Sequence, residues 1–110
     1  MIKILGKKVK VIIDRPLGSI HPQYHNIEYN LNYGYVDEYI GGDGEYQDAY
    51  IIGIDQPLSI FSGIVIAIIH RVNDNEDKWV VAPEGLSFTK EQIDEKVYFQ
   101  EQYFDYQIIN

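Results

Sequence analysis

Short runs of branched and aromatic residues recur along the chain, and residues that favour turns separate them. Such runs are typical of β-strands, and we expect strands at residues 2–5, 9–13, 34–40, 49–54, 64–69 and 78–82. The run at 64–69 is apolar at every position, as in a strand that is buried on both faces at the centre of a sheet. The turn residues predict two hairpins, one from 2–5 with 9–13 and one from 64–69 with 78–82.

A single helix is predicted after these strands. Thr89 and Gln92 have the spacing of a capping box, in which each side chain bonds the backbone N–H of the other residue where a helix begins. Ile93 and Val97 give this helix an apolar edge that can pack on a sheet. The chain has no internal repeat or linker, so residues 1–110 are expected to form a single domain of the mainly β (α+β) class.

A long segment between the first strands is predicted to be irregular. Residues 17–33 follow neither the strand nor the helix period, and irregular segments of this length in small domains tend to carry function. We assign the tyrosines of this segment to the core and to a pocket lining, because platforms that stack nucleic-acid bases pair aromatic residues with Lys and Arg, which the segment lacks. His21 and His25 are not expected to bind a metal, and His70 and Arg71 are expected to cap the exposed end of a strand.

Composition narrows the classes of function. The 110 residues carry a formal net charge of -8 and no cysteine. This composition excludes disulfides and thiolate metal sites, and it disfavours binding to nucleic acid, whose phosphates repel an acidic protein. No apolar stretch is long enough for a signal peptide or a membrane span, so we expect a soluble cytoplasmic protein with no membrane partner.

The acidic residues concentrate in one part of the chain. Residues 16–70 contain seven acids and no Lys or Arg, which indicates either a solvated acidic face or a set of ligands for a cation. Asp43, Glu45 and Asp48 follow one another across a glycine turn, and Asp74 and Asp77 lie in a later turn. Carboxylate oxygens are the ligands that Mg²⁺ prefers. An ordinary polar loop is the alternative interpretation of this pattern.

Five motifs follow one another between residues 14 and 104. They are Asp14-Arg15, Asn32-Tyr-Gly-Tyr35, Asp43-Gly-Glu45-x-x-Asp48, Asp74 with Asp77-Lys78 before Val80-Val-Ala-Pro83, and Phe99-x-Glu101-x-Tyr103. Their order and approximate spacing resemble the type I soluble inorganic pyrophosphatases. The resemblance implies a small closed OB-like β-barrel of short strands with one C-terminal α-helix, which agrees with the strands and helix predicted above.

The resemblance also implies an activity and the residues that perform it. It implies hydrolysis of inorganic pyrophosphate, or of a related small phosphoanhydride, to phosphate, with Mg²⁺ or Mn²⁺ as cofactor and a homo-oligomer as the assembly. The implied metal ligands are Asp43, Asp48, Asp74 and Asp77, and the implied catalytic residue, which orients or deprotonates the attacking water, is Glu45. The implied substrate-binding residues are Arg15, Tyr33, Tyr103, Lys3 and Lys78.

The sequence also departs from the pattern of this family, mostly on the cationic side of the pocket. Glu45 and Phe104 stand where the family has an aspartate and a lysine. The other phosphate-binding lysine of the family lies two residues beyond an aspartate, whereas Lys78 lies one residue beyond Asp77, and Trp79 takes the expected place. On a strand, a change of one residue turns a side chain to the opposite face. Two alternatives therefore stay open: a non-catalytic domain of this fold that binds phosphate or metal, and a structural module that joins subunits.

Overall fold

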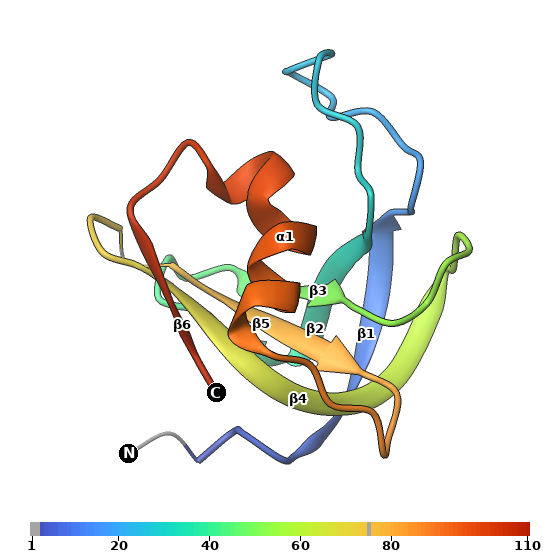
Figure 1. Ribbon diagram of the computed structural model, residues 1–110, viewed down its shortest axis with the longest axis vertical. Coiled ribbons are helices and arrows are strands. Elements are labelled where there is room, and N and C mark those ends of the chain that lie inside the picture. The colour runs from blue at the N-terminus through green and yellow to red at the C-terminus, as the bar shows by residue number, and fades with distance from the viewer. Residues whose placement is uncertain (1–2, 75) are drawn as a thin grey trace.

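Five strands close on themselves into a barrel, and one helix packs beside it (Figure 1). The computed structural model describes residues 3–74 and 76–110. Its elements are β1 (Lys8–Arg15), β2 (Asn32–Ile40), β3 (Tyr46–Ile51), β4 (Ile60–Arg71), β5 (Asp77–Ala82), α1 (Lys90–Glu101) and β6 (Tyr106–Ile109). The sheet runs in the order β1-β2-β3-β5-β4-β6, and a further pairing of β1 with β4 closes the barrel. This architecture confirms the mainly β fold class, a small OB-like barrel with a helix near the C-terminus.

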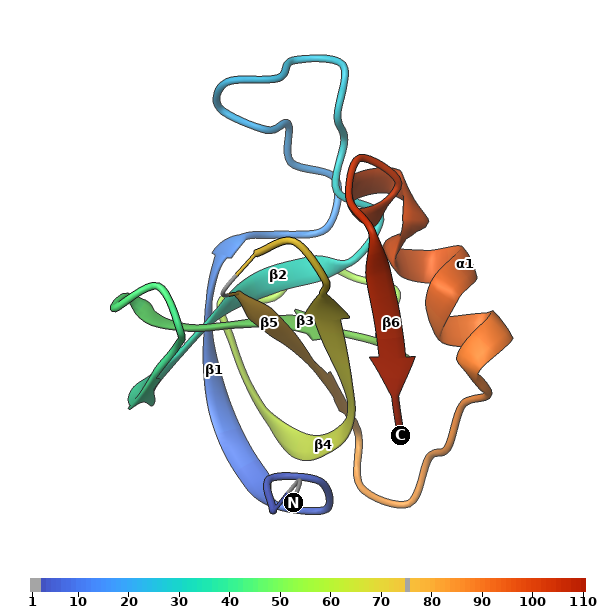
Figure 2. The same ribbon diagram turned by 90° about the vertical axis from the view of Figure 1, so that its left-hand side faces the viewer.

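The long strand β4 makes the closure possible. It pairs with β1 through Ile60 to Ile64, with β5 from Ile64 onward and with β6 near its end, and its register shifts between Val65 and Ala67. Because such a shift bends a strand, β4 curves around one side of the molecule, as Figure 2 shows. The strand predicted at 64–69 lies inside β4, and its predicted hairpin with β5 is confirmed.

The two faces of the barrel wall pack into two apolar clusters. Residues from all five barrel strands, among them Ile51 and Val81, form the interior of the barrel. Their neighbours Tyr50 and Val80 face the other way and pack beneath α1. Ile93 and Val97 are fully buried in this second cluster, which confirms the predicted apolar edge of the helix. Among the described residues, no helix is long and apolar enough to cross a membrane.

Gly34 allows β1 and β2 to approach each other closely. A Cβ atom at this position would lie 1.9 Å from the backbone oxygen of Ile12, a separation that no real side chain tolerates. Glycine in a strand often marks such a close approach of another backbone. Gly34 thereby fixes the register of β2, which carries Tyr33 beside Arg15.

Two of the strand predictions were wrong. The first hairpin does not form: residues 4–6 make a turn, and β1 pairs with β2 on one edge and β4 on the other, so neither edge is left for a strand at 3–5. Ile2 lies outside the described residues. The second error concerns β6, a strand of four residues that was not predicted. The strand predicted at 49–54 exists as β3 but begins and ends three residues earlier.

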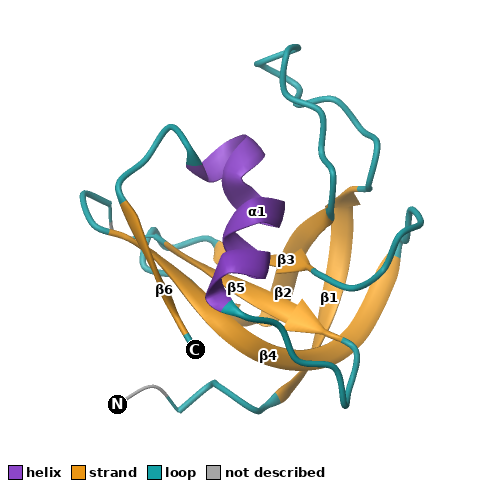
Figure 3. Ribbon diagram, viewed as in Figure 1, coloured by secondary structure: helices purple, strands orange, loops and turns teal. Residues whose placement is uncertain are grey.

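The segment between β1 and β2 is irregular, as predicted, and it projects from one end of the barrel (Figure 3). Hydrogen bonds between its own backbone groups nevertheless connect the two halves of the segment. Residues Ile20 and Glu28 form an isolated bridge, and the backbone N–H of Gly18 donates to the oxygen of Tyr29 over 2.7 Å. We call residues 16–31 the β1–β2 loop.

The capping box predicted at Thr89 is present. The Thr89 Oγ1 accepts from the backbone N–H of Gln92 over 3.1 Å, and the Gln92 side chain accepts from the backbone N–H of Thr89 over 2.9 Å. Both bonds satisfy N–H groups that have no partner inside the helix.

Thr89→Ala should therefore lower the free energy of unfolding by about 1 kcal/mol, the usual value of an N-cap side chain. Urea unfolding followed by the fluorescence of Trp79, the single tryptophan, measures the change. Thr89→Ser should retain most of the stability, and Ser87→Ala, in the preceding loop, is the matched control. Equal midpoints for Thr89→Ala and the unchanged protein would contradict the role of the cap.

Candidate functional site

A cavity of about 740 Å³ is lined by residues of the β1–β2 loop, of the barrel strands and of the C-terminal end of α1. Five of the residues that the sequence predicted for the site line this cavity: Arg15, Tyr33, Asp48, Lys78 and Tyr103. They come from β1, β2, β3, β5 and the turn after α1, so the barrel wall and the segment after the helix both contribute. The other predicted site residues, described below, lie outside this lining.

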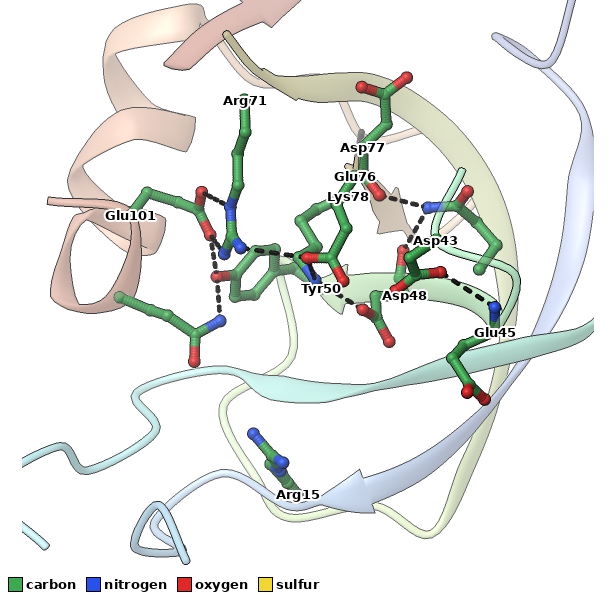
Figure 4. A network of polar contacts seen from close by, with 12 residues as sticks. Arg15, Asp43, Glu45, Asp48, Tyr50, Arg71, Glu76, Asp77, Lys78 and Glu101 are labelled. Atoms are coloured by element: carbon green, nitrogen blue, oxygen red, sulfur yellow. Dashed lines mark hydrogen bonds and ion pairs between the residues drawn. The ribbon is translucent and has the colours of Figure 1, made fainter. Parts of the chain in front are cut away.

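Lys78 occupies the centre of the polar network in Figure 4. Its side chain is 4% exposed, and its Nζ donates to Asp48 Oδ2 over 2.5 Å and to Glu76 Oε2 over 3.0 Å. Trp79, the next residue on β5, points instead into the barrel interior. Lys78 therefore lines the cavity, although it follows Asp77 by one residue and not by the two residues of the family pattern.

Glu76 lies on the same face as Lys78 and was not predicted as a site residue. It lies two residues before Lys78, so the two side chains share a face, whereas Asp77 faces away and lies 2.8 Å from Nδ1 of His70. The strand alternation around Lys78 was the signal that could have identified Glu76.

The carboxyl group of Glu76 also reaches Asp43. A hydrogen bond between the two carboxyls, followed by burial, raises the pKa of Glu76, and Lys78 partly offsets this. The same hydrogen bond, together with one from the backbone of Glu45, lowers the pKa of Asp43. The ammonium group of Lys78 thus binds two carboxylates, those of Asp48 and Glu76, and Glu76 in turn is coupled to Asp43.

Arg15 lies over the same Tyr33 ring that Lys78 approaches. Its guanidinium carbon is 5.8 Å from the ring centre of Tyr33, and the Lys78 Nζ is also 5.8 Å from that centre. Nη1 of Arg15 donates to the hydroxyl of Tyr29 over 2.6 Å. Burial raises the pKa of Tyr33 well above its usual value, so its hydroxyl stays protonated and remains a donor.

A chain of buried hydrogen bonds continues from Tyr29 through the helix. The Tyr29 hydroxyl donates to Gln100 Oε1 over 2.7 Å, and Gln100 Nε2 donates to the Tyr50 hydroxyl over 2.7 Å. Tyr50 in turn donates to Glu101 Oε2 over 2.6 Å. Glu101 is fully buried and receives Arg71 in a bidentate pair, through Nε over 2.9 Å and Nη2 over 2.8 Å. We call this set of bonds the Gln100–Glu101 network.

Arg71 is a second cavity residue that was not predicted for the site. It was expected at an exposed strand end, but it is 5% exposed and lines the cavity. Nη1 donates to Glu76 over 3.2 Å, and the guanidinium carbon lies 3.7 Å from the ring centre of Phe104. Phe104 stands where the family has a lysine, and the guanidinium of Arg71 supplies a positive charge at this place. Its partner Glu101 lies 30 residues away in sequence, so no local sequence pattern predicts the ion pair.

Several predicted residues lie elsewhere. Glu45 and Asp43 are exposed in the β2–β3 turn, where Asp43 Oδ1 accepts from the backbone N–H of Glu45 over 3.0 Å. Asp74 lines a smaller cavity of about 390 Å³ that shares Arg71 with the first one. Lys3 is exposed and precedes β1, whereas the cavity lies beside Arg15, at the other end of that strand. Asp74, Asp77 and Lys3 are therefore not brought to the cavity.

Solved structures of inorganic pyrophosphatases superimpose on this chain over most of its length. The enzyme from Neisseria gonorrhoeae superimposes with a TM-score of 0.68 and 20% identity, over 92% of this chain and 79% of that one. The enzyme from Ehrlichia chaffeensis gives a TM-score of 0.70 and 15% identity, over 94% and 85% of the two chains. That from Coxiella burnetii gives 0.67 and 15%, over 94% and 84%.

The chain has the fold of these enzymes. At such identities the likeness shows the fold alone. No protein-family model matches the sequence, and no curated protein matches it either.

The carboxylates of the cavity, as arranged here, do not form a metal site. Within residues 3–74 and 76–110, no three His, Asp or Glu side chains converge as ligands for a metal ion. The ammonium of Lys78 stands between Asp48 and Glu76, the position that a cation shared by these two carboxylates would take. Among the predicted metal ligands, Asp74 and Asp77 are directed elsewhere.

Proposed function

We propose that the protein hydrolyses inorganic pyrophosphate or a related small phosphoanhydride to phosphate. The observation that carries the proposal is the pair of cations, Arg15 and Lys78, at equal distances from the ring of Tyr33 inside one cavity. A guanidinium offers a fork of donors to phosphate oxygens, and an ammonium offers a compact charge. Tyr33 and Tyr103 add hydroxyl donors. The fold that this chain shares with inorganic pyrophosphatases supports the same substrate class.

The charge balance of the cavity supports a substrate that arrives with a cation. Equal numbers of cationic and carboxylate side chains line it: Arg15, Arg71, Lys78, Asp14, Asp48 and Glu76. A pyrophosphate anion would therefore meet no excess of positive charge. We propose the Mg²⁺ or Mn²⁺ complex of pyrophosphate as the substrate, in which the ion offsets the charge of the phosphates.

We propose that the carboxylate that accepts a proton from the attacking water lies inside the cavity. Glu45, implied by the resemblance, lies in the exposed β2–β3 turn, and its role stays a prediction. Asp48 lies inside the cavity and beside Lys78, within reach of a phosphate held there. Asp48 is therefore the better placed acceptor in this arrangement.

Phosphate release from pyrophosphate tests the proposal. We expect release with millimolar Mg²⁺ or Mn²⁺ to exceed release in EDTA by at least about tenfold, which corresponds to about 1.4 kcal/mol of activation free energy. Lys78→Ala should lower the rate by about tenfold or more, because it removes a charge that contacts the transition state. Lys10→Ala, an exposed lysine of β1, is the matched control. No release under any of these conditions would refute hydrolysis of pyrophosphate.

A second candidate function is binding of phosphate compounds without turnover. The ion pairs of Lys78 with Asp48 and Glu76 favour this function, because they engage the carboxylates that catalysis would use. A protein of this kind would gain thermal stability in pyrophosphate, because a ligand stabilises the folded state that binds it, and would release no phosphate.

The assembly and the location are part of the same proposal. We propose a cytoplasmic homo-oligomer. Large apolar side chains of the β2–β3 hairpin support an interface, since Tyr39, Ile40 and Tyr46 are exposed to 41%, 65% and 50%.

A further inference from the structure

The cavity is larger than its charged part. Its volume of about 740 Å³ lies in the range typical of sites for drug-sized small molecules, and inorganic pyrophosphate is much smaller than such ligands. The additional space lies against the β1–β2 loop, whose residues His21, Gln23, Tyr24 and Asn26 belong to the lining. The chemistry of these residues indicates what the second part of the cavity binds.

A continuous series of contacts leads from the charged part to the loop. Lys78 and Arg15 both lie 5.8 Å from the ring of Tyr33. Arg15 donates to the hydroxyl of Tyr29 over 2.6 Å, and the ring of His21 stacks on Tyr29 with 6.2 Å between centres and 11° between planes. Behind the lining, the buried Tyr29 thus links Arg15 to His21, and the lining itself changes from the cations Arg15 and Lys78 to the rings of His21 and Tyr24 on the loop.

Tyr24 ends this series at the mouth of the cavity. Its ring centre lies 5.0 Å from that of His21, and 58% of its surface is exposed. An aromatic ring exposed at the rim of a cavity offers a face for stacking by a planar ligand. The amide side chains of Gln23 and Asn26 lie in the same lining and offer both donors and acceptors.

The loop holds these groups in place by its own hydrogen bonds. The backbone N–H groups of Gln23 and Tyr24 donate to Nδ1 of His21 over 3.1 and 3.2 Å. Because Nδ1 accepts, the proton of the neutral ring lies on Nε2, which is a donor. Burial and the charge of Arg15 lower the pKa of His21, which favours this neutral form.

We propose that this pocket binds a nucleoside diphosphate or triphosphate, with its phosphates at Arg15 and Lys78 and its base against Tyr24. Asp14 lines the cavity beside Arg15 and provides a carboxylate acceptor for the hydroxyls of a ribose. This inference rests on the proposed function, since it places the phosphoanhydride in the same charged part. It goes beyond that function because the organic group of the substrate is recognised by the loop.

Calorimetric titration with two probes, ADP and pyrophosphate, each in Mg²⁺, tests the inference. We expect ADP to bind more tightly than pyrophosphate. Tyr24→Ala should weaken the binding of ADP by about tenfold, in line with the stacking of a base on an aromatic side chain, and should leave pyrophosphate binding unchanged. His21→Ala should act in the same direction. Tyr98→Ala, which removes an equally exposed tyrosine from α1, is the matched control.

The outcomes separate this inference from the proposed function. Binding of pyrophosphate with ADP no tighter, or an equal loss of both ligands in Tyr24→Ala, would overturn the nucleotide assignment and leave the proposed function standing. Absence of binding for both probes would overturn both. Because Tyr24 is mostly exposed, its replacement is not expected to unfold the protein, and the melting temperature of the variant checks this.

Discussion

Glu101→Leu should lower the free energy of unfolding by about 3 to 5 kcal/mol, the usual cost of removing one partner of a buried ion pair. Glu101 is fully buried and accepts both Nε and Nη2 of Arg71 as well as the hydroxyl of Tyr50. Its replacement leaves a buried guanidinium without its main counter-ion. Urea unfolding followed by the fluorescence of Trp79 measures the loss.

The double variant Arg71→Met with Glu101→Leu distinguishes the effect of an unpaired charge on stability from the effect of altered packing. Removal of both charges leaves no unpaired ion, so the double variant should be more stable than Glu101→Leu alone. Glu95→Leu, on an exposed position of the same helix, is the control for an added leucine. A loss below about 1 kcal/mol in Glu101→Leu, the range of exposed pairs, would show that the pair does not anchor the helix.

Arg15→Ala should reduce phosphate release from pyrophosphate by about a hundredfold or more, equivalent to about 3 kcal/mol of transition-state stabilisation. Arg15 is one of the two cations on which the proposed substrate contact depends, and its guanidinium faces the ring of Tyr33. The melting temperature should change little, because Tyr29 keeps its hydrogen bond to Gln100. Rate and melting temperature are measured on the same preparation.

Two further variants define what Arg15 contributes. Arg15→Lys keeps the charge and loses the fork of donors, so it should recover only part of the rate. Lys10→Ala, on the same strand and outside the cavity, should keep the full rate. If Arg15→Ala loses stability but retains its rate, the residue is structural and forms part of the end of β1.

The strands whose partners are near in sequence were the easiest to predict. The hairpin of β4 and β5 follows from an apolar run, a turn and a second apolar run, and α1 from its capping box. The first hairpin was wrong because the edges of β1 are taken by β2 and β4, which are distant in sequence. β6 was missed because its four residues become a strand through pairing with the end of β4, and no local periodicity shows this.

The residues of the candidate site also divide into those that a local motif predicts and those that depend on partners distant in sequence. Residues within conspicuous motifs, such as Arg15, Tyr33 and Asp48, are brought together in the cavity. Lys78 was predicted there, but the acid that accompanies it is Glu76 and not Asp77, because alternation on β5 sets which side chains share a face. Arg71 could not be found from its neighbours, since Glu101 and Phe104, which hold it, come from the end of α1 and the turn after it.

The Gln100–Glu101 network has a consequence for how the molecule opens. Both residues lie in the last turns of α1, and their side chains bind Tyr29, Tyr50 and Arg71 of the barrel and the loop. The helix end therefore cannot unwind without releasing the wall of the cavity, so the two belong to one cooperative unit of local unfolding. A ligand that fills the cavity contacts Gln100 at the end of the helix and stabilises that unit as a whole, so its binding should slow the fraying of the last turns of α1.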